Sequence, residues 1–163
     1  MRKNIIFIGF MGCGKSTIAK ALAKKLNAEF IDTDKVIKKR LGKDIKSVFA
    51  EFGEEFFREE ERKLAEEFLD LKGCVIATGG GFYKALRKDK NSMIIYLQAS
   101  FRFLEKRLGK KGLEKRPLFA DREKAKLLFK ERLDKYKKKA NLTINIEHKS
   151  VKKIVDEILK EIQ

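Results

Sequence analysis

Five short segments of the chain are apolar at nearly every position and lack the alternation of a half-exposed strand. Continuous apolar runs of this length are typical of strands that are buried on both faces of a parallel sheet. The segments are NIIFIG at 4–9, AEFID at 28–32, CVIAT at 74–78, MIIYLQ at 93–98 and LTINI at 142–146. They predict the central sheet of an α/β protein.

Helical patterns fill most of the intervals between these predicted strands. In 15–26, Ile18, Leu22 and Leu26 form one apolar stripe with lysines opposite, as on a helix that packs against a sheet. Helical spacing also occurs in 53–71, 100–108, 122–140 and 150–162. The order βαβ(α)αβαβαβα, in which the bracketed helix is left open, predicts a three-layer α/β fold in a single domain over residues 1–163.

Length and composition agree with one domain. Of the 163 residues, 43% are apolar, which is enough for one sizeable core. No apolar run approaches the roughly 20 residues that span a membrane. The two cysteines, Cys13 and Cys74, form no CxxC or Cys/His pattern. We therefore expect a cytoplasmic protein that makes no membrane contact.

The net charge of +16 raises the question of a nucleic-acid partner. However, 39% of the residues are charged, and acidic residues occur throughout the chain. Segments such as FREEERKLAEEF at 57–68 are typical of solvated helix faces with i,i+4 pairs. No motif combines aromatic and basic residues as nucleic-acid-binding motifs do. We expect no nucleic-acid partner, and we expect a monomer.

The stretch GFMGCGKST at 9–17 joins the first predicted strand to the first predicted helix. Its spacing Gly9-x-x-x-x-Gly14-Lys15-Ser16 matches the P-loop pattern in the structural context that the pattern requires. Backbone N–H groups at the helix start can hold phosphates, Lys15 can reach the β- and γ-phosphates, and Ser16 can bind Mg²⁺. A simple glycine turn would not require the lysine, so the sequence predicts a nucleoside triphosphate site.

The residues after the second and third strands narrow the class of P-loop protein. No guanine-reading NKxD string is present, and the third strand ends in VIATGGG without the carboxylate of a motor ATPase. The second strand ends in FIDTD, so Asp32 and Asp34 are candidate carboxylates for the metal and for an acceptor hydroxyl. The alternative is a solvated strand-to-helix turn with Asp34 as the helix cap.

The segment GKKGLEKRPLFA at 109–120 departs from the helical pattern. It contains two glycines, the only proline of the chain and four basic side chains. We interpret it as a mobile loop over the site, with a candidate lid at about 110–120. An ordinary surface loop is the alternative, although it explains the pair Arg116–Pro117 less well.

Six motifs, taken in their order and spacing, resemble the shikimate kinase family over essentially the whole chain. They are GFMGCGKST, FIDTD, GEEFFREEE, ATGGGF, RPLF and ERLDKYKKKA. The resemblance implies the nucleoside monophosphate kinase fold, with a five-stranded parallel sheet in order 2-3-1-4-5, a substrate-binding helical segment at about 32–62 and a lid. It also implies ATP-dependent phosphorylation of the shikimate 3-hydroxyl, with Mg²⁺, in the pathway to chorismate and the aromatic amino acids.

The resemblance implies roles for individual residues at the acceptor. Asp34 is expected to bind the reacting hydroxyl, and Asp32 to lie near Mg²⁺. Shikimate is an anionic polyol, and its carboxylate suits a bidentate cation such as Arg58 or Arg132. The implied acceptor-binding residues are Asp34, Arg58, Glu61, Gly79, Gly80, Gly81 and Arg132, with Glu61 holding Arg58 in place.

The nucleotide side follows from the same resemblance. Arg107 is expected to pack on adenine, and Arg116 to act as the lid arginine near the phosphates. The catalytic set is Lys15, Asp34 and Arg116, and the metal-binding set is Ser16 and Asp32. The implied ATP-binding residues are Gly12, Cys13, Gly14, Lys15, Ser16, Thr17, Arg107 and Arg116.

Less specific interpretations stand beside several of these assignments. Arg58 alone resembles one more exposed helix charge, and Gly79–Gly81 resemble a turn after a strand. Phe49 and Phe57 are candidates either for a wall of the substrate site or for the core. The chain also departs from the family at Asn141, where an acidic residue is common.

Two competing functions remain open at this point. A kinase of the same fold could act on gluconate, which is also an anionic polyol, or on a nucleotide. The DTD and GGG motifs together favour shikimate. The second competitor is a non-catalytic nucleotide- or RNA-binding module that uses the positive charge, although the lysine, metal hydroxyl and acceptor carboxylate are all retained.

Overall fold

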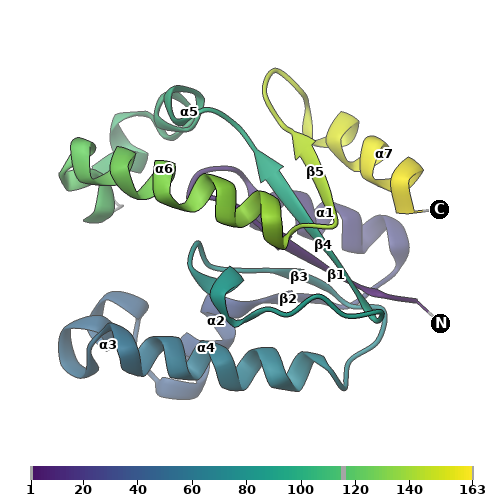
Figure 1. The fold of residues 1–163 in the computed structure, drawn as a ribbon, viewed down its shortest axis with the longest axis horizontal. Coiled ribbons are helices and arrows are strands. Elements are labelled where there is room, and N and C mark those ends of the chain that lie inside the picture. Colours follow the sequence, from purple (N-terminus) through teal and green to yellow (C-terminus); the bar gives the residue numbers. More distant parts are fainter. Residues whose placement is uncertain (1, 115–116, 163) are drawn as a thin grey trace.

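A five-stranded parallel sheet forms the centre of the protein (Figure 1). The computed structural model describes residues 2–114 and 117–162. The strand order is β2-β3-β1-β4-β5, as the resemblance to the shikimate kinase family implied. The strand bounds are Asn4–Ile8 for β1, Phe30–Asp32 for β2, Val75–Ala77 for β3, Ser92–Gln98 for β4 and Leu142–Asn145 for β5.

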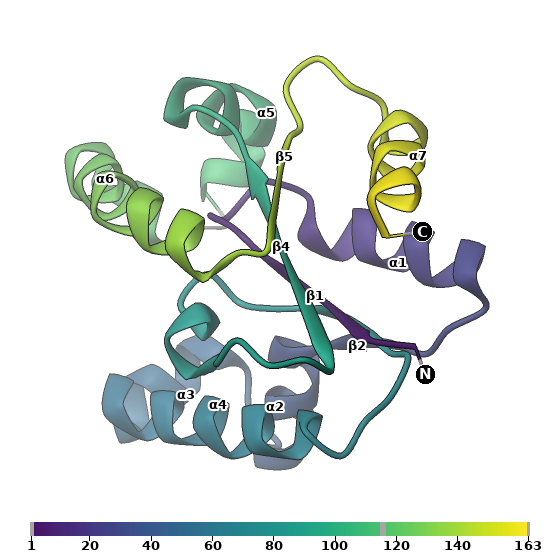
Figure 2. The same ribbon diagram turned by 45° about the vertical axis from the view of Figure 1, so that its right-hand side comes forward.

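Helices cover both faces of this sheet. Figure 2 shows α1 (Lys15–Leu26) and α7 (Val151–Ile162) on one side, and α4 (Glu54–Phe68) and α6 (Arg122–Lys139) on the other. The predicted stripe of α1 is buried at Ile18 and Leu22, and full burial of such side chains contributes about 1.5–3 kcal/mol each. Within the described residues, every helix is too short or too polar to cross a lipid bilayer.

Two short helices precede α4, where the sequence analysis left one helix open. They are α2 (Thr33–Leu41) and α3 (Ile45–Phe52). α2 ends at Gly42, whose left-handed backbone (φ 67°) lets its N–H donate to Lys38 O. The side chain of Asp44 then caps α3 by accepting from the Ser47 N–H. The predicted helix at 53–71 is shorter than expected, because α4 ends at Phe68.

The segment predicted as a loop at 109–120 is helical in most of its described residues. α5 runs from Phe101 to Glu114 and is kinked at Gly109 (φ 63°, ψ 178°), and η2 (Pro117–Ala120) is a 3-10 helix. The expectation of a loop was therefore wrong for these residues, because short helical turns carry little apolar periodicity. Phe119 of η2 is buried and packs edge-on against Phe10, with ring centroids 6.2 Å apart.

The carboxyl ends of β1, β2 and β3 meet at one edge of the sheet. β1 pairs in parallel with β3 and β4, and β2 pairs in parallel with β3. The Thr78 hydroxyl donates to Phe7 O (2.6 Å) and so ties the end of β3 to β1. Ligands bind at this kind of edge in open α/β sheets. The fold thus places the glycine loop after β1, the aspartates of β2 and the triple glycine after β3 side by side.

Candidate active site

The glycine loop passes from β1 directly into the start of α1. Gly12 has a φ of 85°, and Gly14, the N-cap of α1, has φ 85° and ψ 24°, both in the left-handed region that favours glycine. No side chain caps α1, so its first backbone N–H groups remain available. Cys13 is buried between the two glycines. This geometry is that of an anion site at a helix N-terminus.

The ammonium group of Lys15 folds back over this loop. Its Nζ donates to Gly9 O (2.5 Å) and to Phe10 O (3.2 Å). It also lies 3.7 Å from the Cys13 sulfur. The loop therefore carries its own cation, which hydrogen-bonds to two carbonyl groups. A phosphate oxygen is a stronger acceptor for an ammonium group than a carbonyl oxygen, so bound phosphate would replace these carbonyl contacts.

Ser16 and Asp32 form a pair of oxygen groups beside the loop. The Ser16 hydroxyl donates to Asp32 Oδ2 (2.9 Å). The other oxygen, Oδ1, accepts from the backbone N–H groups of Asp34 (3.1 Å) and Lys35 (3.3 Å). Asp32 is thus the N-cap of α2, so the alternative that assigned this cap to Asp34 was wrong. β2 ends at Asp32 as predicted, but α2 begins at Thr33, two residues before the start that an Asp34 cap would require.

A hydroxyl and a carboxylate fit Mg²⁺ better than a softer metal, because Mg²⁺ prefers oxygen ligands and retains waters and substrate phosphates. In the described part of the chain, no group of three or more His, Cys, Asp and Glu residues could hold a metal ion. Ser16 and Asp32 are therefore the oxygen pair to consider for a cation that is bound mainly through phosphate.

Three of the predicted site side chains lie against Gly79–Gly81, one at each glycine. A Cβ atom on the first glycine would be 2.7 Å from Asp34 Oδ1. On the second it would be 3.1 Å from Arg132 Nη1, and on the third 2.6 Å from Arg58 Cζ. All three distances are shorter than normal Cβ contacts, and none of these glycines has a positive φ. Close approach of these side chains therefore favours glycine at all three positions.

Arg58 of α4 is held in place by carboxylates of its own helix. Its Nη1 donates to Glu61 Oε1 (2.5 Å), and its Nη2 lies 3.3 Å from Glu54 Oε1. Its side chain is only 14% exposed, so the interpretation of Arg58 as one more solvated helix charge does not hold. Burial lowers the pKa of this guanidinium, but the two carboxylates outweigh burial and the net shift is upward.

Glu61 is a buried carboxylate next to these groups. The residue is 1% exposed, and its Oε2 has no hydrogen-bond partner among the described residues. Burial raises the pKa of Glu61 above its usual value, and the hydrogen bond and charge of Arg58 oppose this shift. Asp34 raises the same pKa and Arg132 lowers it, so both lie within electrostatic reach of Glu61.

Arg132 reaches the same region from α6. It is 6% exposed, and its Nε has no hydrogen-bond partner within the described part of the chain. One turn later, the Tyr136 hydroxyl donates to Gly80 O (2.7 Å) and ties α6 to the glycine turn. A buried guanidinium with an unused donor is suited to an anionic ligand.

The remaining predicted residues are distributed around this centre. Arg107 of α5 lies over the loop, because a Cβ atom on Gly14 would be 2.8 Å from its Nη2. Thr17 is exposed in the first turn of α1. Arg116 lies outside the described residues. Phe57 is buried and packs on Phe49, with ring centroids 4.9 Å apart, so Phe57 belongs to the core.

Three contributing residues were given no role by the sequence analysis. The Thr33 hydroxyl accepts from the Gly79 N–H (3.1 Å), Tyr136 holds Gly80, and Glu54 contacts Arg58. The position of Thr33 between the two aspartates was the only local signal for it. The i,i+4 spacing of Glu54 and Arg58 was visible, but such pairs are common on exposed helices.

Comparisons with known proteins agree with each other. The sequence model of the family "Shikimate kinase" matches residues 11–163. The chain is 43% identical to a shikimate kinase of Sulfurihydrogenibium sp. (strain YO3AOP1), over 99% of this chain and 98% of that protein. It is 42% identical to a shikimate kinase of Persephonella marina, over 99% of both chains.

Solved structures give the same result. A shikimate kinase from Acinetobacter baumannii, in complex with shikimate, superposes with a TM-score of 0.86 at 29% identity, covering 99% of this chain and 93% of that one. A shikimate kinase from Aquifex aeolicus superposes with a TM-score of 0.81 at 31% identity, covering 98% of this chain and 95% of that one.

Proposed function

Because the chain belongs to the shikimate kinase family, we propose that it transfers the γ-phosphoryl group of ATP to the 3-hydroxyl of shikimate. A bond forms between the hydroxyl oxygen and γ-phosphorus, and the bond from γ-phosphorus to the bridging oxygen of ADP breaks. The hydroxyl proton passes to water in the same reaction. The products are shikimate 3-phosphate and ADP, in the pathway to chorismate and the aromatic amino acids.

The observation that carries this proposal is the meeting of Asp34, Arg58 and Arg132 at the Gly79–Gly81 turn. Two guanidinium groups bind the shikimate carboxylate, and Arg132 offers the Nε donor that has no partner among the described residues. Asp34 accepts the hydrogen bond of the reacting hydroxyl. Glu61 keeps Arg58 in position. The glycine turn leaves room for the ring against the backbone.

The glycine loop binds ATP in this proposal. Backbone N–H groups from Gly12 to Thr17 surround the β-phosphate, and Lys15 exchanges its carbonyl partners for phosphate oxygens. Arg107, which lies over Gly14, packs on adenine. Arg116 is assigned to the transferring phosphoryl group by the family motif alone.

Mg²⁺ is the proposed metal, and Ser16 with Asp32 would hold it. When bound, it neutralises charge on the β- and γ-phosphates. Phosphoryl transfer of this type depends mainly on positioning and electrostatics, so the main task of Asp34 is to orient the hydroxyl toward the γ-phosphate.

The whole chain, 1–163, is proposed as a single domain with a substrate-binding segment at about 32–62 and a lid at about 110–120. Both cysteines are free and buried, which suits a reducing cytoplasm. The large exposed apolar side chains of the described residues are Phe52 in α3, Leu69 just after α4 and Leu127 in α6, and this scatter supports a monomer.

A substrate panel tests the proposal. Coupled assays of ADP release should show a kcat/KM for shikimate at least about 1,000-fold above that for nucleoside monophosphates, which have no carboxylate to pair with the two arginines. Gluconate does have a carboxylate, and we expect its kcat/KM to be lower because its open chain does not hold a hydroxyl at Asp34 while the carboxylate contacts both arginines. If gluconate or a nucleotide were phosphorylated at a comparable rate, shikimate would not be the specific acceptor that we propose. If the protein bound RNA with a steep salt dependence and phosphorylated none of these substrates, it would be a nucleic-acid-binding module and not a kinase.

A further inference from the structure

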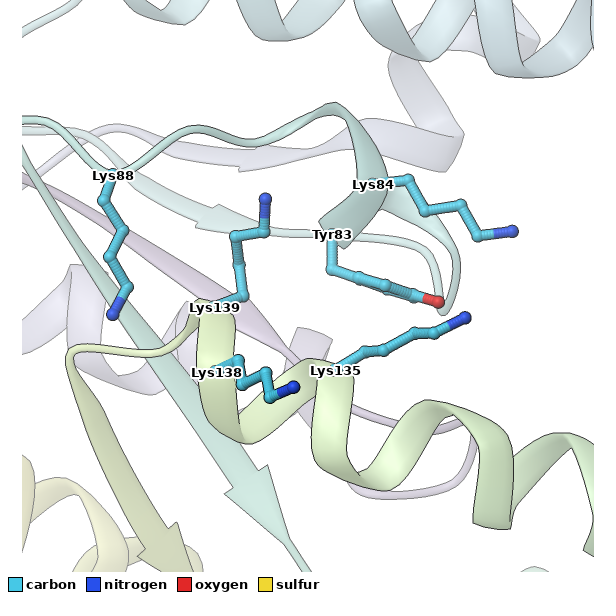
Figure 3. A pocket seen from close by; sticks show the side chains of 6 residues that line it. All are labelled: Tyr83, Lys84, Lys88, Lys135, Lys138 and Lys139. Carbon is cyan, nitrogen blue, oxygen red and sulfur yellow. The ribbon is translucent and has the colours of Figure 1, made fainter.

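An open surface pocket lies between η1 (Phe82–Ala85) and the C-terminal end of α6 (Figure 3). Its volume is about 350 Å³. Five of its six lining side chains are lysines, and no carboxylate lines it. We call it the lysine pocket; its lining residues are Tyr83, Lys84, Lys88, Lys135, Lys138 and Lys139.

The ammonium groups of this pocket are only partly neutralised. Lys135 pairs with Glu131 at 3.3 Å, and Lys139 Nζ donates to Leu86 O (2.5 Å). Within the described part of the chain, the other three lysines form no ion pair. Burial lowers the pKa of Lys139, and the charge of Lys88 lowers it further. The ammonium groups of the pocket therefore repel one another, and a bound anion would reduce this repulsion.

Helix electrostatics alone do not account for the cluster. The negative end of the α6 dipole favours Lys138 and Lys139 in the last helical turn. It does not explain Lys84 and Lys88, which come from a different segment and line the same pocket with side chains that extend in different directions (Figure 3).

Tyr83 supplies an independent observation. The residue is 4% exposed, yet its hydroxyl has no hydrogen-bond partner within residues 2–114 and 117–162. In Figure 3 this hydroxyl extends in the same direction as the ammonium ends of Lys84 and Lys135. A buried, unpartnered hydroxyl is rare in folded proteins and calls for a partner. Beside several ammonium groups, the fitting partner is an anionic oxygen.

We infer that the lysine pocket binds a small, multiply charged anion of the polyphosphate or phosphate-ester class, next to the proposed shikimate site, since Lys84 also lines the hollow that contains Arg58 and Glu61. The lysines supply positive charge from two elements, and the Tyr83 hydroxyl donates to one anionic oxygen. The ligand would bridge η1 and α6. Nucleic acid suits the pocket less well, because the Tyr83 ring is buried and offers no face for a base to stack on.

Calorimetric titration with inorganic triphosphate tests this inference. The protein is first saturated with ADP and shikimate, so that the other two anion sites are occupied. We expect saturable 1:1 binding by the wild type. The double variant Lys88→Gln/Lys138→Gln should bind roughly tenfold more weakly or worse, since two ammonium partners are removed. The variant Tyr83→Phe should weaken binding by up to about tenfold, the scale of one hydrogen bond to a charged group.

The matched control is Lys20→Gln/Lys24→Gln, which removes the same charge from exposed positions of α1 on the other face of the sheet. It should bind within about twofold of the wild type, because screened surface charges act weakly at a distance. If both double variants lost the same amount of triphosphate affinity, the loss would come from net charge alone and the inference would be overturned. Absence of saturable binding to the wild type would also overturn it, as would tighter binding of an RNA oligonucleotide than of triphosphate at equal phosphate concentration.

Discussion

Arg58 lies directly against Gly81, and any side chain at position 81 would overlap its guanidinium group. A Cβ atom there would be 2.6 Å from Arg58 Cζ, well inside normal contact distance. The backbone of Gly81 is in an ordinary right-handed conformation (φ −102°, ψ −1°), so other residues could adopt it. The space occupied by Arg58 is therefore what requires glycine.

This relationship predicts the effect of Gly81→Ala. The new methyl group should displace the Arg58 guanidinium from its position beside Glu61 and leave the glycine loop unchanged. We expect the KM for shikimate to rise roughly tenfold or more, since about 1.4 kcal/mol corresponds to each factor of ten. The KM for ATP should stay within about twofold. Steady-state kinetics with each substrate varied in turn measures both, and an unchanged KM for shikimate would contradict the proposed contact.

Substitutions of the two aspartates of the DTD motif should have different effects on the kinetics. Asp34→Asn keeps the shape of the side chain and removes its charge, so the acceptor hydroxyl loses a charged partner. We expect kcat to fall by at least about 100-fold, the usual scale for a positioned acid–base group. ATP affinity should barely change.

Asp32→Asn is the matched variant, because Asp32 bonds Ser16 and caps α2. It should raise the Mg²⁺ concentration required for half-maximal rate, measured by magnesium titration at fixed ATP. If Asp34→Asn instead weakened Mg·ATP binding and retained a near-normal rate at saturating shikimate, the roles of the two aspartates would have to be exchanged.

Lys15→Ala tests the phosphate site. The ammonium group now held by Gly9 O and Phe10 O would be missing when charge develops on the γ-phosphate. Loss of one such electrostatic contact costs roughly 100- to 1,000-fold in kcat. Near-full turnover of this variant at saturating ATP would rule out the assignment. The melting temperature serves as the folding control.

The buried Glu61 predicts a pH dependence of stability. Burial raises its pKa above the usual 4.5, although Arg58 opposes the shift. The contribution of this carboxyl to the free energy of unfolding is then fully present below about pH 4.5 and is lost as pH rises through the folded-state pKa. The free energy of unfolding of the wild type minus that of Glu61→Gln should therefore fall with rising pH in denaturant titrations. A rise would show that the ion pair with Arg58 outweighs burial.

The sequence predicted those parts of the fold that depend on a single local pattern of residues. The apolar runs predicted all five strands, and the spacing from Gly9 to Ser16 predicted the loop before α1. α2 was left open because it buries only Thr33 and Ile37, too few for a helical stripe. Its start also depends on where β2 ends, and that end makes Asp32 the cap.

Contacts between distant segments could not be predicted in this way. The position of Arg132 against Gly80 depends on how α6 packs over the turn after β3, and no local pattern encodes that distance. Asn141 is a further case. Its side-chain oxygen accepts from the Ile94 N–H (2.8 Å), which joins the start of β5 to β4. The carboxylate that is common at this position could accept the same bond, so the amide preserves this contact.

The kink in α5 predicts how the lid moves. Gly109 has φ 63° and ψ 178°, a conformation that is essentially restricted to glycine. Residues before the kink contact the glycine loop, since a Cβ atom on Gly12 would be 3.0 Å from Leu108 Cγ. Phe119 anchors the far end in the core. We therefore predict that residues 110–114, directly after the kink, close over both substrates when these bind.

Hydrogen exchange measures this closure. In the wild type, amides in 110–114 should exchange roughly tenfold more slowly when ADP and shikimate are bound. Gly109→Ala favours a straight helix, so the slowing should largely disappear and kcat should fall. Gly53→Ala is the matched control, because Gly53 has a similar backbone (φ 86°, ψ 168°) and, like Gly109, no atom within 4 Å of an added Cβ. It should lose comparable stability and retain the ligand-dependent slowing. Equal slowing in both variants would mean that Gly109 is not the hinge.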